Sequence, residues 1–322
     1  MTIGQRLTVG TDDVAAYARD LTAEWNAERA VYVRQILGAR RGATDAGTAA
    51  LTRSRLTAVA DAFEHNANVI GSLLAPLLAL ADGAAELSET SAHKRGFLAY
   101  LFRDWVWGQS EIDELLTGVS TSLPDFTAEH LLAVGGGAMR LPRDLARRLG
   151  ATKVTVVERD PVLCCAVDRL QAGDALELFE IPVTPRNLAS VTALRTLEWT
   201  DEAPPLDIVL ADARSWEPRE PVDVLLTPFV LDVAGADAIE LIERWTSWLR
   251  PEGWWIDVGP LGFRSPATPA CYTIEEVRDR LPSLGLDVRG QNSFDMNHLA
   301  SPLSGRVQRY TIEVTVAQKC PA

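Results

Sequence analysis

Residues 131–137 read Leu131-Leu132-Ala133-Val134-Gly135-Gly136-Gly137. The four apolar residues predict a short strand buried on both faces, and the glycines predict a tight turn before a helix. Because glycine has no Cβ, such a turn lets the backbone approach a ligand closely at the carboxyl end of the strand. The spacing is not GxGxxG, since Arg140 stands where the third glycine would be, and this weakens a nicotinamide interpretation.

Around this stretch, short apolar segments alternate with helical patterns, which predicts βαβ units and a parallel sheet covered on both faces. We expect strands at residues 131–134, 153–157, 207–211, 222–226 and 254–258, and helices at 141–149, 161–172, 236–249 and 274–281. Residues 306–317 alternate in polarity and predict an antiparallel edge strand paired with a strand near 286–293. Residues 173–205 are interpreted as an insertion. The predicted fold class is α/β, with a Rossmann-like, mostly parallel sheet and an antiparallel last strand.

Residues 11 to about 118 show helical patterns throughout, with Thr11 and Asp12 as candidate N-caps of the first helix. Two further long helices are predicted at 48–80 and 93–115. We therefore expect two domains, an N-terminal helical cap at 1–118 and a nucleotide-binding domain at 119–322. The helical part is either a lid that excludes water from the site or a dimerisation surface.

The composition restricts the partners. A formal net charge of −13 argues against nucleic acids, whose phosphates need basic surfaces, and favours a small neutral or cationic molecule. The cysteines are Cys164, Cys165, Cys271 and Cys320, and their spacing argues against zinc. The most apolar stretch, 69–81, is too short to span a membrane, and the N-terminus lacks the apolar core of a signal peptide. We expect a cytoplasmic protein without a membrane partner, and a homodimer is a further expectation.

Two acids follow the glycine turn at the ends of the next strands. Glu158 ends the second expected strand, 21 residues beyond Gly137, where its carboxylate can accept hydrogen bonds from both ribose hydroxyls. Asp212 ends the third, where an acidic side chain can receive an adenine amino group. Together the turn and the acids predict a nucleoside site at the switch point of an open sheet.

Four stretches resemble motifs of the carnosine N-methyltransferase-like branch of the class I methyltransferases. Phe102-Arg103-Asp104-Trp105 resembles its RDW motif, and residues 135–141 are similar to its GAGLGRL loop. Residues 229–234 resemble FFIDTA, and residues 249–261 resemble LKPGGIWINLGPL. The order and spacing agree from about residue 95 onward.

The resemblance implies a class I methyltransferase fold with S-adenosyl-L-methionine as cofactor. It places the cofactor's methionine part at Gly135 and Gly137, its ribose at Glu158, and its adenine at Asp212 and Ala213. Gly136 is a further candidate for the cofactor site. Arg103 would lie near the cofactor's carboxylate, and Thr227 is a further candidate for the cofactor site. Asp232, in the FFIDTA-like motif, would face the acceptor nitrogen.

Departures from the family pattern fall mainly on the acceptor side. Met139 replaces the last glycine of the loop, so we expect this loop to turn differently or to be crowded by a side chain. Gly235-Ala236 replaces His-Asn, Asp257 replaces an asparagine, Gly262-Phe263 replaces an apolar-Tyr pair, and Tyr100 replaces a glutamine. We therefore expect a substrate other than carnosine.

The predicted function is methyl transfer from S-adenosyl-L-methionine to a small molecule, at nitrogen, with Asp232 orienting the acceptor. Asp257 and Tyr100 are further catalytic candidates. For several residues a structural role competes: Asp232 as a helix N-cap, Arg103 and Asp104 as a surface pair, and Trp105 and Trp107 as packing residues. His65 and His298 are interpreted as isolated structural histidines, and Cys164 and Cys165 as small core residues.

An alternative keeps the cofactor and changes the reaction. In azetidine-2-carboxylate synthases, which look like methyltransferases, the methionine amine of the cofactor attacks its own side chain and releases methylthioadenosine. Gly235, Asp257 and Tyr100 would suit such a site, which has no second substrate. A third hypothesis is a non-enzymatic scaffold that binds no cofactor.

Overall fold

The computed structural model describes residues 2–3, 6–11, 13–81, 97–199, 203–263 and 268–321 of the chain. The chain divides into two compact units, each assembled from separate segments. The first comprises Met1–Gly108, Asp160–Thr200 and Leu299–Val307, and the second comprises Gln109–Arg159, Asp201–His298 and Gln308–Ala322. The predicted domain boundary after residue 118 stays a prediction.

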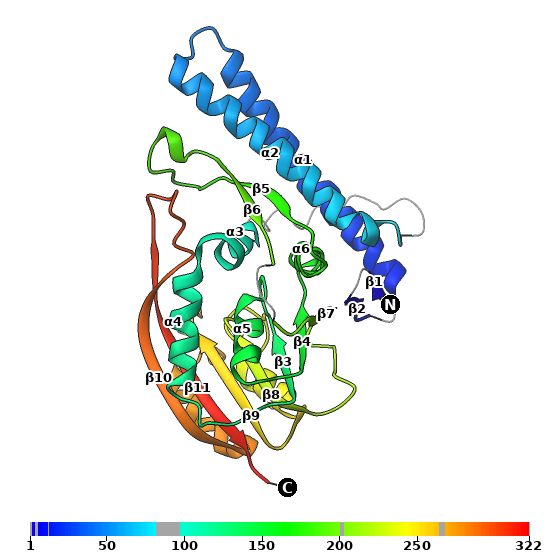
Figure 1. The fold of residues 1–322 in the computed structure, drawn as a ribbon, viewed down its shortest axis with the longest axis vertical. Coiled ribbons are helices and arrows are strands. Elements are labelled where there is room, and N and C mark those ends of the chain that lie inside the picture. The colour runs from blue at the N-terminus through cyan, green and yellow to red at the C-terminus, as the bar shows by residue number, and fades with distance from the viewer. Residues whose placement is uncertain are drawn as a thin grey trace. The chain divides into compact units, whose positions relative to one another are not determined.

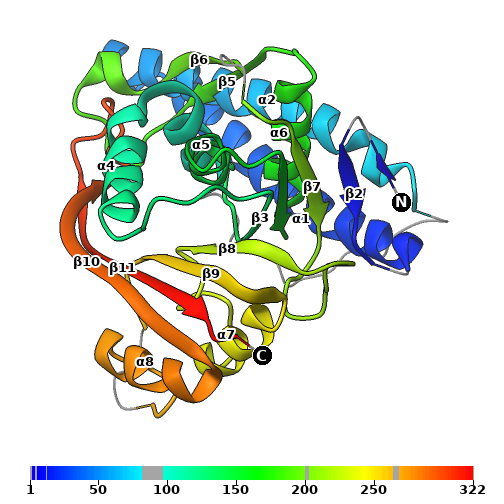
Figure 2. The ribbon, with the colours of Figure 1, turned by 60° about the horizontal axis from the view of Figure 1, so that its bottom comes forward.

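The second unit is built on a twisted sheet (Figure 2). Its strands are β3 (His130–Val134), β4 (Lys153–Glu158), β7 (Leu206–Leu210), β8 (Val222–Pro228), β9 (Leu249–Gly259), β10 (Leu286–His298) and β11 (Gln308–Lys319). They follow the order β7-β4-β3-β8-β9-β11-β10. The pairs from β7 to β9 are parallel, and β11 is antiparallel to both of its neighbours. The predicted α/β fold with a mostly parallel sheet and an antiparallel last strand is confirmed.

The predicted position of the last strand is wrong. We expected residues 306–317 at the edge, but β11 lies between β9 and β10, and β10 forms that edge of the unit's sheet. Only the first four residues of β11, Gln308 to Thr311, are exposed as an edge strand would be. Its second half, Val314 to Ala317, is buried on both faces, as an inner strand requires.

Helices α4 (Gln109–Ser120), α5 (Arg140–Arg148), α7 (Ala238–Thr246) and α8 (Ile274–Arg280) complete the second unit. Asp237 caps α7, because its side chain accepts hydrogen bonds from the amides of Ile239 (2.9 Å) and Glu240 (3.3 Å). The alternative interpretation of Asp232 as this N-cap is therefore wrong. At the other end of α7, Lys319 donates to the carbonyls of Thr246 (3.1 Å) and Leu249 (2.7 Å).

Tryptophans dominate the core on the α7 side of this sheet. Trp245 and Trp255 are fully buried, and they pack with the apolar side chains of β8, β9 and α7. The Trp245 indole nitrogen donates to the carbonyl of Ala213 (3.0 Å), so the core fixes the loop that follows β7.

In the first unit, α1 (Val14–Thr44) and α2 (Ala50–Leu78) run side by side as a long helical hairpin (Figure 1). The unit also contains β1 (Thr2–Ile3), β2 (Leu7–Val9), α3 (Phe97–Phe102), a π-helix (Arg103–Trp107), α6 (Pro161–Gln171), β5 (Leu176–Glu180), a 3₁₀ turn (Leu188–Ser190) and β6 (Ala193–Leu197). The expected insertion at 173–205 contains the antiparallel hairpin β5–β6. The buried Cys164 and Cys165 lie in α6, as the sequence predicts.

Two helix predictions in this region need correction. Asp13 caps α1 by accepting from the Ala16 amide (2.8 Å), so the predicted cap at Thr11 is wrong, and Asp12 lies outside the described residues. The single helix expected at 93–115 is interrupted, because the π-helix ends at Trp107, Gly108 follows as its C-cap, and α4 starts at Gln109. Residues 93–96 lie outside the described residues. In the described parts of the chain, no helix is long and apolar enough to cross a membrane.

Candidate active site

The glycine turn connects β3 to α5 and is packed too closely to accept side chains. Gly135 and Gly137 have positive φ angles of 75° and 56°. A Cβ on Gly135 would lie 2.8 Å from Val230 Cγ2, and one on Gly136 would lie 2.4 Å from Val156 Cγ1. The turn therefore needs glycine for both its conformation and its packing.

Met139 is the last residue of the turn and the N-cap of α5. Its φ of 70° is left-handed, and its amide donates to the Gly136 carbonyl (2.8 Å). This left-handed conformation is one that glycine adopts without strain. The expectation that the loop turns differently from the family's or is crowded by the side chain stays a prediction. The left-handed backbone costs about 1–2 kcal/mol for a residue with a Cβ. The side chain is fully buried, which offsets this cost.

Glu158 ends β4 beside this turn. Its Oε2 accepts a hydrogen bond from the Gly137 amide (3.0 Å), and its Oε1 accepts from the Arg159 amide (2.8 Å). The carboxylate is 8% exposed. The structure therefore brings two of the predicted cofactor residues into direct contact at the carboxyl ends of neighbouring strands.

Asp212 lies just after β7, at the next strand end. The guanidinium and the amide of Arg214 donate to its carboxylate, with Nε–Oδ2 and N–Oδ1 distances of 2.9 Å. These hydrogen bonds and the positive charge lower the pKa of Asp212. This ion pair was not predicted from the sequence, although the two residues are only two positions apart.

Asp232 follows β8 on the acceptor side of the predicted site. Its Oδ2 accepts from the Gly262 amide (2.8 Å), and a Cβ on Gly262 would lie 2.9 Å from the same oxygen. The absence of a side chain at Gly262 is therefore what allows the carboxylate to reach the backbone. Burial raises the pKa of Asp232 despite this hydrogen bond.

Asp257 is buried in β9, in register with Thr227 of β8. The Thr227 hydroxyl donates to Asp257 Oδ1 (2.7 Å) and accepts from the Trp255 indole nitrogen (3.0 Å). Burial raises the pKa of Asp257 to about 7, and the negative charge of Asp232 adds to this effect. Thr227 is fully buried in this chain of hydrogen bonds.

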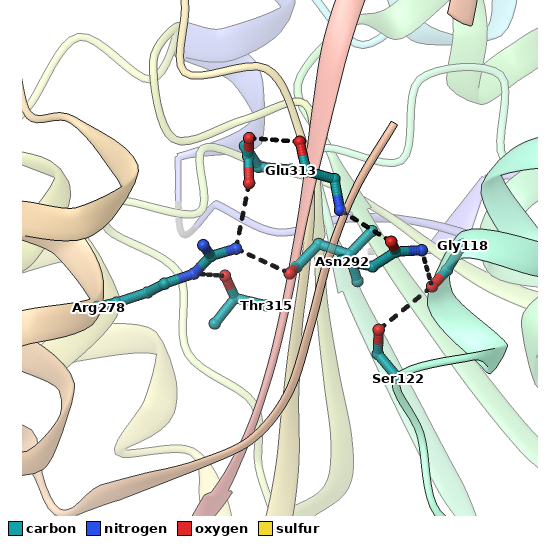
Figure 3. A network of polar contacts seen from close by, with 8 residues as sticks. Gly118, Ser122, Arg278, Asn292, Glu313 and Thr315 are labelled. Atoms are coloured by element: carbon teal, nitrogen blue, oxygen red, sulfur yellow. Dashed lines mark hydrogen bonds and ion pairs between the residues drawn. The ribbon is translucent and has the colours of Figure 1, made fainter. Parts of the chain in front are cut away.

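A polar network continues along β11 (Figure 3). Thr315 is in register with Asp257, and its hydroxyl accepts from Arg278 Nε (3.1 Å). A terminal nitrogen of Arg278 also donates to Glu313 (3.2 Å) and to the Val314 carbonyl (3.0 Å). The positive charge of Arg278 weakly opposes the rise in the pKa of Asp257. On β10, the Asn292 side chain donates to the Gly118 carbonyl of α4 (3.4 Å).

Arg103 and Tyr100 belong to the first unit. Arg103 Nε pairs with Asp104 Oδ1 at 2.6 Å, and the guanidinium carbon lies 5.5 Å from the centre of the Tyr100 ring. Both charged side chains are buried, so their interpretation as a surface pair is wrong. The segment is a π-helix, a conformation that is frequent at functional sites. Trp105 packs against Trp199, with ring centroids 5.1 Å apart.

The sequence analysis missed one group of residues. His298 is neither isolated nor exposed, because its ring stacks on Phe229, lies next to Tyr310 and faces Glu111. These residues come from β10, the end of β8, β11 and α4, and no local pattern connects them. The positive φ of Phe229 (52°) is equally absent from any sequence signal.

No family model matches this chain, and no curated protein matches it. Among solved structures it is similar to the N-methyltransferase NodS from Bradyrhizobium japonicum in complex with S-adenosyl-L-homocysteine, at 13% identity and a TM-score of 0.41, with 70% of this chain and 97% of that chain covered. It is also similar to an S-adenosylmethionine-dependent methyltransferase from Mesorhizobium loti, at 13% identity and 0.41, with 65% and 100% covered. A third is the [4+2]-cyclase SpnF, at 15% identity and 0.43, with 67% and 84% covered.

The strand order and the single antiparallel strand in the second unit carry the fold assignment. They define a sheet like that of the class I methyltransferases, as the sequence predicts.

Proposed function

We propose that the protein transfers a methyl group from S-adenosyl-L-methionine to a nitrogen atom of a small molecule. The observation that carries the proposal is the contact between Gly137 and Glu158. It joins a glycine turn to a buried carboxylate at the carboxyl ends of two adjacent parallel strands, where open α/β sheets bind nucleosides.

The residues present fit this cofactor. The turn has no room for a Cβ at Gly135 or Gly136, so no side chain of the turn itself stands between its backbone and a ligand. Glu158 would accept hydrogen bonds from ribose hydroxyls, and Asp212 with Ala213 would hold the adenine. Arg103, in the first unit, stays a prediction from the sequence. When bound, S-adenosyl-L-methionine supplies a methyl group activated by a sulfonium.

On the acceptor side, Asp232 would hold the substrate. Its carboxylate is fixed by the Gly262 amide, and Asp257 lies close enough for the two charges to interact. A cationic amine would relieve the repulsion between the two acids, so an ammonium-bearing small molecule is the substrate class they favour. Tyr100, in the first unit, stays a prediction from the sequence.

Methyl transfer from a sulfonium is an in-line displacement, so catalysis consists mainly of orientation and exclusion of water. Asp232 orients the acceptor through its charge and through its fixed position on the backbone. The buried hydrogen bonds from Trp255 to Thr227 and from Thr227 to Asp257 hold the carboxyl group of Asp257 in place.

A product assay tests the proposal. The protein is incubated with S-adenosyl-L-methionine alone and with each of ethanolamine, putrescine, histamine and benzylamine. We expect S-adenosyl-L-homocysteine only when an amine is present, and we expect the Asp232→Asn variant to lose this activity while it still binds S-adenosyl-L-homocysteine. Rapid formation of methylthioadenosine without any amine would support the competing cyclisation and refute methyl transfer. Failure to bind the cofactor in calorimetry would support the non-enzymatic scaffold.

A further inference from the structure

Four side chains form a cluster that the proposed mechanism does not yet use. The buried His298 ring at the end of β10 stacks on Phe229, with ring centroids 5.0 Å apart and planes 16° apart. Tyr310 of β11 lies 5.5 Å away at a tilt of 57°. Glu111 of α4 is the fourth member, and its side chain is 7% exposed. Two rings and a carboxylate thus position the imidazole.

This cluster is connected to the proposed site through packing contacts. The Phe229 amide donates to the Val258 carbonyl (2.8 Å), which holds Phe229 at the end of β9. Val230, the next residue, fills the space into which a Cβ on Gly135 would project. The residue on which His298 stacks therefore belongs to the segment that touches the glycine turn and continues into Asp232.

The chemistry of His298 suits proton transfer. Its Nδ1 lies 3.9 Å from a carboxylate oxygen of Glu111, within the range of an ion pair when the ring is protonated. Packing alone would be served by an apolar ring, whereas a buried imidazole and carboxylate are costly to desolvate unless they interact. Among the described residues, Glu111 and Tyr310 are the titratable groups that these contacts place next to His298.

Proton transfer is also what the proposed reaction requires. An alkylamine binds at neutral pH as an ammonium ion, which has no lone pair to attack the methyl carbon. Asp232 can pair with that ion, but a base with a pKa near neutral pH removes the proton more effectively. Histidine is the side chain whose ordinary pKa meets this requirement.

We propose that His298 is the general base for the acceptor amine, with Glu111 as its positioning residue and Asp232 as the binding site for the ammonium ion. The inference rests on the proposed methyl transfer. A proton passes from the ammonium nitrogen to the imidazole of His298. The freed lone pair forms the N–C bond, and the C–S electron pair remains on sulfur. The proton then leaves His298 for solvent, while the methylated amine and S-adenosyl-L-homocysteine are the products.

The test compares wild type with His298→Asn and Glu111→Gln, using the four amines named above between pH 6.5 and 9.5. His65→Asn, which alters a histidine bound to the Glu177 carbonyl in the first unit, is the control. At pH 7 we expect His298→Asn to slow turnover about 100-fold. Its rate should then rise with pH, because more of the amine arrives already deprotonated. Glu111→Gln should show a smaller loss with the same pH trend.

Binding of S-adenosyl-L-homocysteine, measured by calorimetry, separates chemistry from folding. We expect the dissociation constants of all variants to stay within about twofold of wild type, since none of the altered side chains belongs to the cofactor site. If His298→Asn does not fold, His298→Gln and Glu111→Gln carry the comparison. If His298→Asn turns over as fast as wild type at pH 7, His298 is not the base. A loss of turnover that is the same at every pH would refute that role as well. Either result would leave the proposed methyl transfer standing. If wild type forms no S-adenosyl-L-homocysteine from any amine, the proposed function fails first.

Discussion

Replacing Asp257 with asparagine should make the stability of the protein less dependent on pH. The carboxyl group has a pKa of about 7 in the folded protein, against 3.8 as its ordinary value, because it is buried. The folded state therefore binds this proton more tightly than the unfolded state does. Stability is highest below the ordinary pKa and falls as the pH rises through the folded-state value.

The size of this effect follows from the two pKa values. Each pH unit corresponds to about 1.4 kcal/mol, so ionising Asp257 in the folded protein costs about 4 kcal/mol in total. About 2.5 kcal/mol of this cost arises between pH 5 and pH 8, since the unfolded carboxyl group is already ionised at pH 5. An asparagine at this position carries no charge, and its oxygen can still accept from the Thr227 hydroxyl.

Urea denaturation of wild type and Asp257→Asn at pH 5, 6, 7 and 8 measures this difference. We expect the variant to gain stability relative to wild type as the pH rises, by about 2.5 kcal/mol over this range. Thr227→Val is the matched control. It removes a hydrogen bond that favours the ionised carboxylate, so its loss of stability should increase with pH. A difference between wild type and Asp257→Asn that is the same at pH 5 and pH 8 would refute the reasoning.

Three further predictions concern single contacts. Glu158→Gln should weaken S-adenosyl-L-homocysteine binding by about 1.5–3 kcal/mol, because the charge-assisted hydrogen bonds to the ribose are lost. Glu177→Gln is the control. If calorimetry gives Glu158→Gln and wild type the same affinity, Glu158 does not belong to the site. Gly118→Ala should destabilise the protein by about 1–3 kcal/mol in urea denaturation, since its Cβ would lie 2.2 Å from the Phe294 ring. Adding Phe294→Leu to this variant should recover part of the lost stability. If the double variant is no more stable than Gly118→Ala, the clash is not the cause. Lys319→Met should lower stability by about 1–3 kcal/mol, because three carbonyls at the end of α7 lose their donor, whereas Lys319→Arg should lose less.

The sheet was predictable because its parallel strands are buried on both faces and therefore appear as short continuous apolar runs, as in β3 and β4. The position of β11 was not, because its first residues are exposed as in an edge strand, and only the strand order shows that it lies between β9 and β10. The π-helix at Arg103 depends on packing in the first unit, and no propensity distinguishes it from an ordinary helix.

The predicted site shows the same division. The glycine turn and Glu158 follow a spacing set by strand and helix lengths, so the sequence alone placed them at neighbouring strand ends. The contact of Asp232 with Gly262 joins residues 30 positions apart, and only the folded backbone reveals it. The residues around His298 come from four parts of the chain, namely α4, the end of β8, β10 and β11. The sequence around His298 therefore gave no sign of these contacts.

Met139 adopts the left-handed backbone conformation that glycine usually provides. Its left-handed φ and buried side chain retain the shape of the turn without the last glycine. A search pattern that requires glycine there would reject this chain, whereas a pattern written in dihedral angles would accept it. Substituting glycine would relieve the strained backbone and leave a cavity the size of a methionine side chain. Met139→Gly should therefore reduce stability.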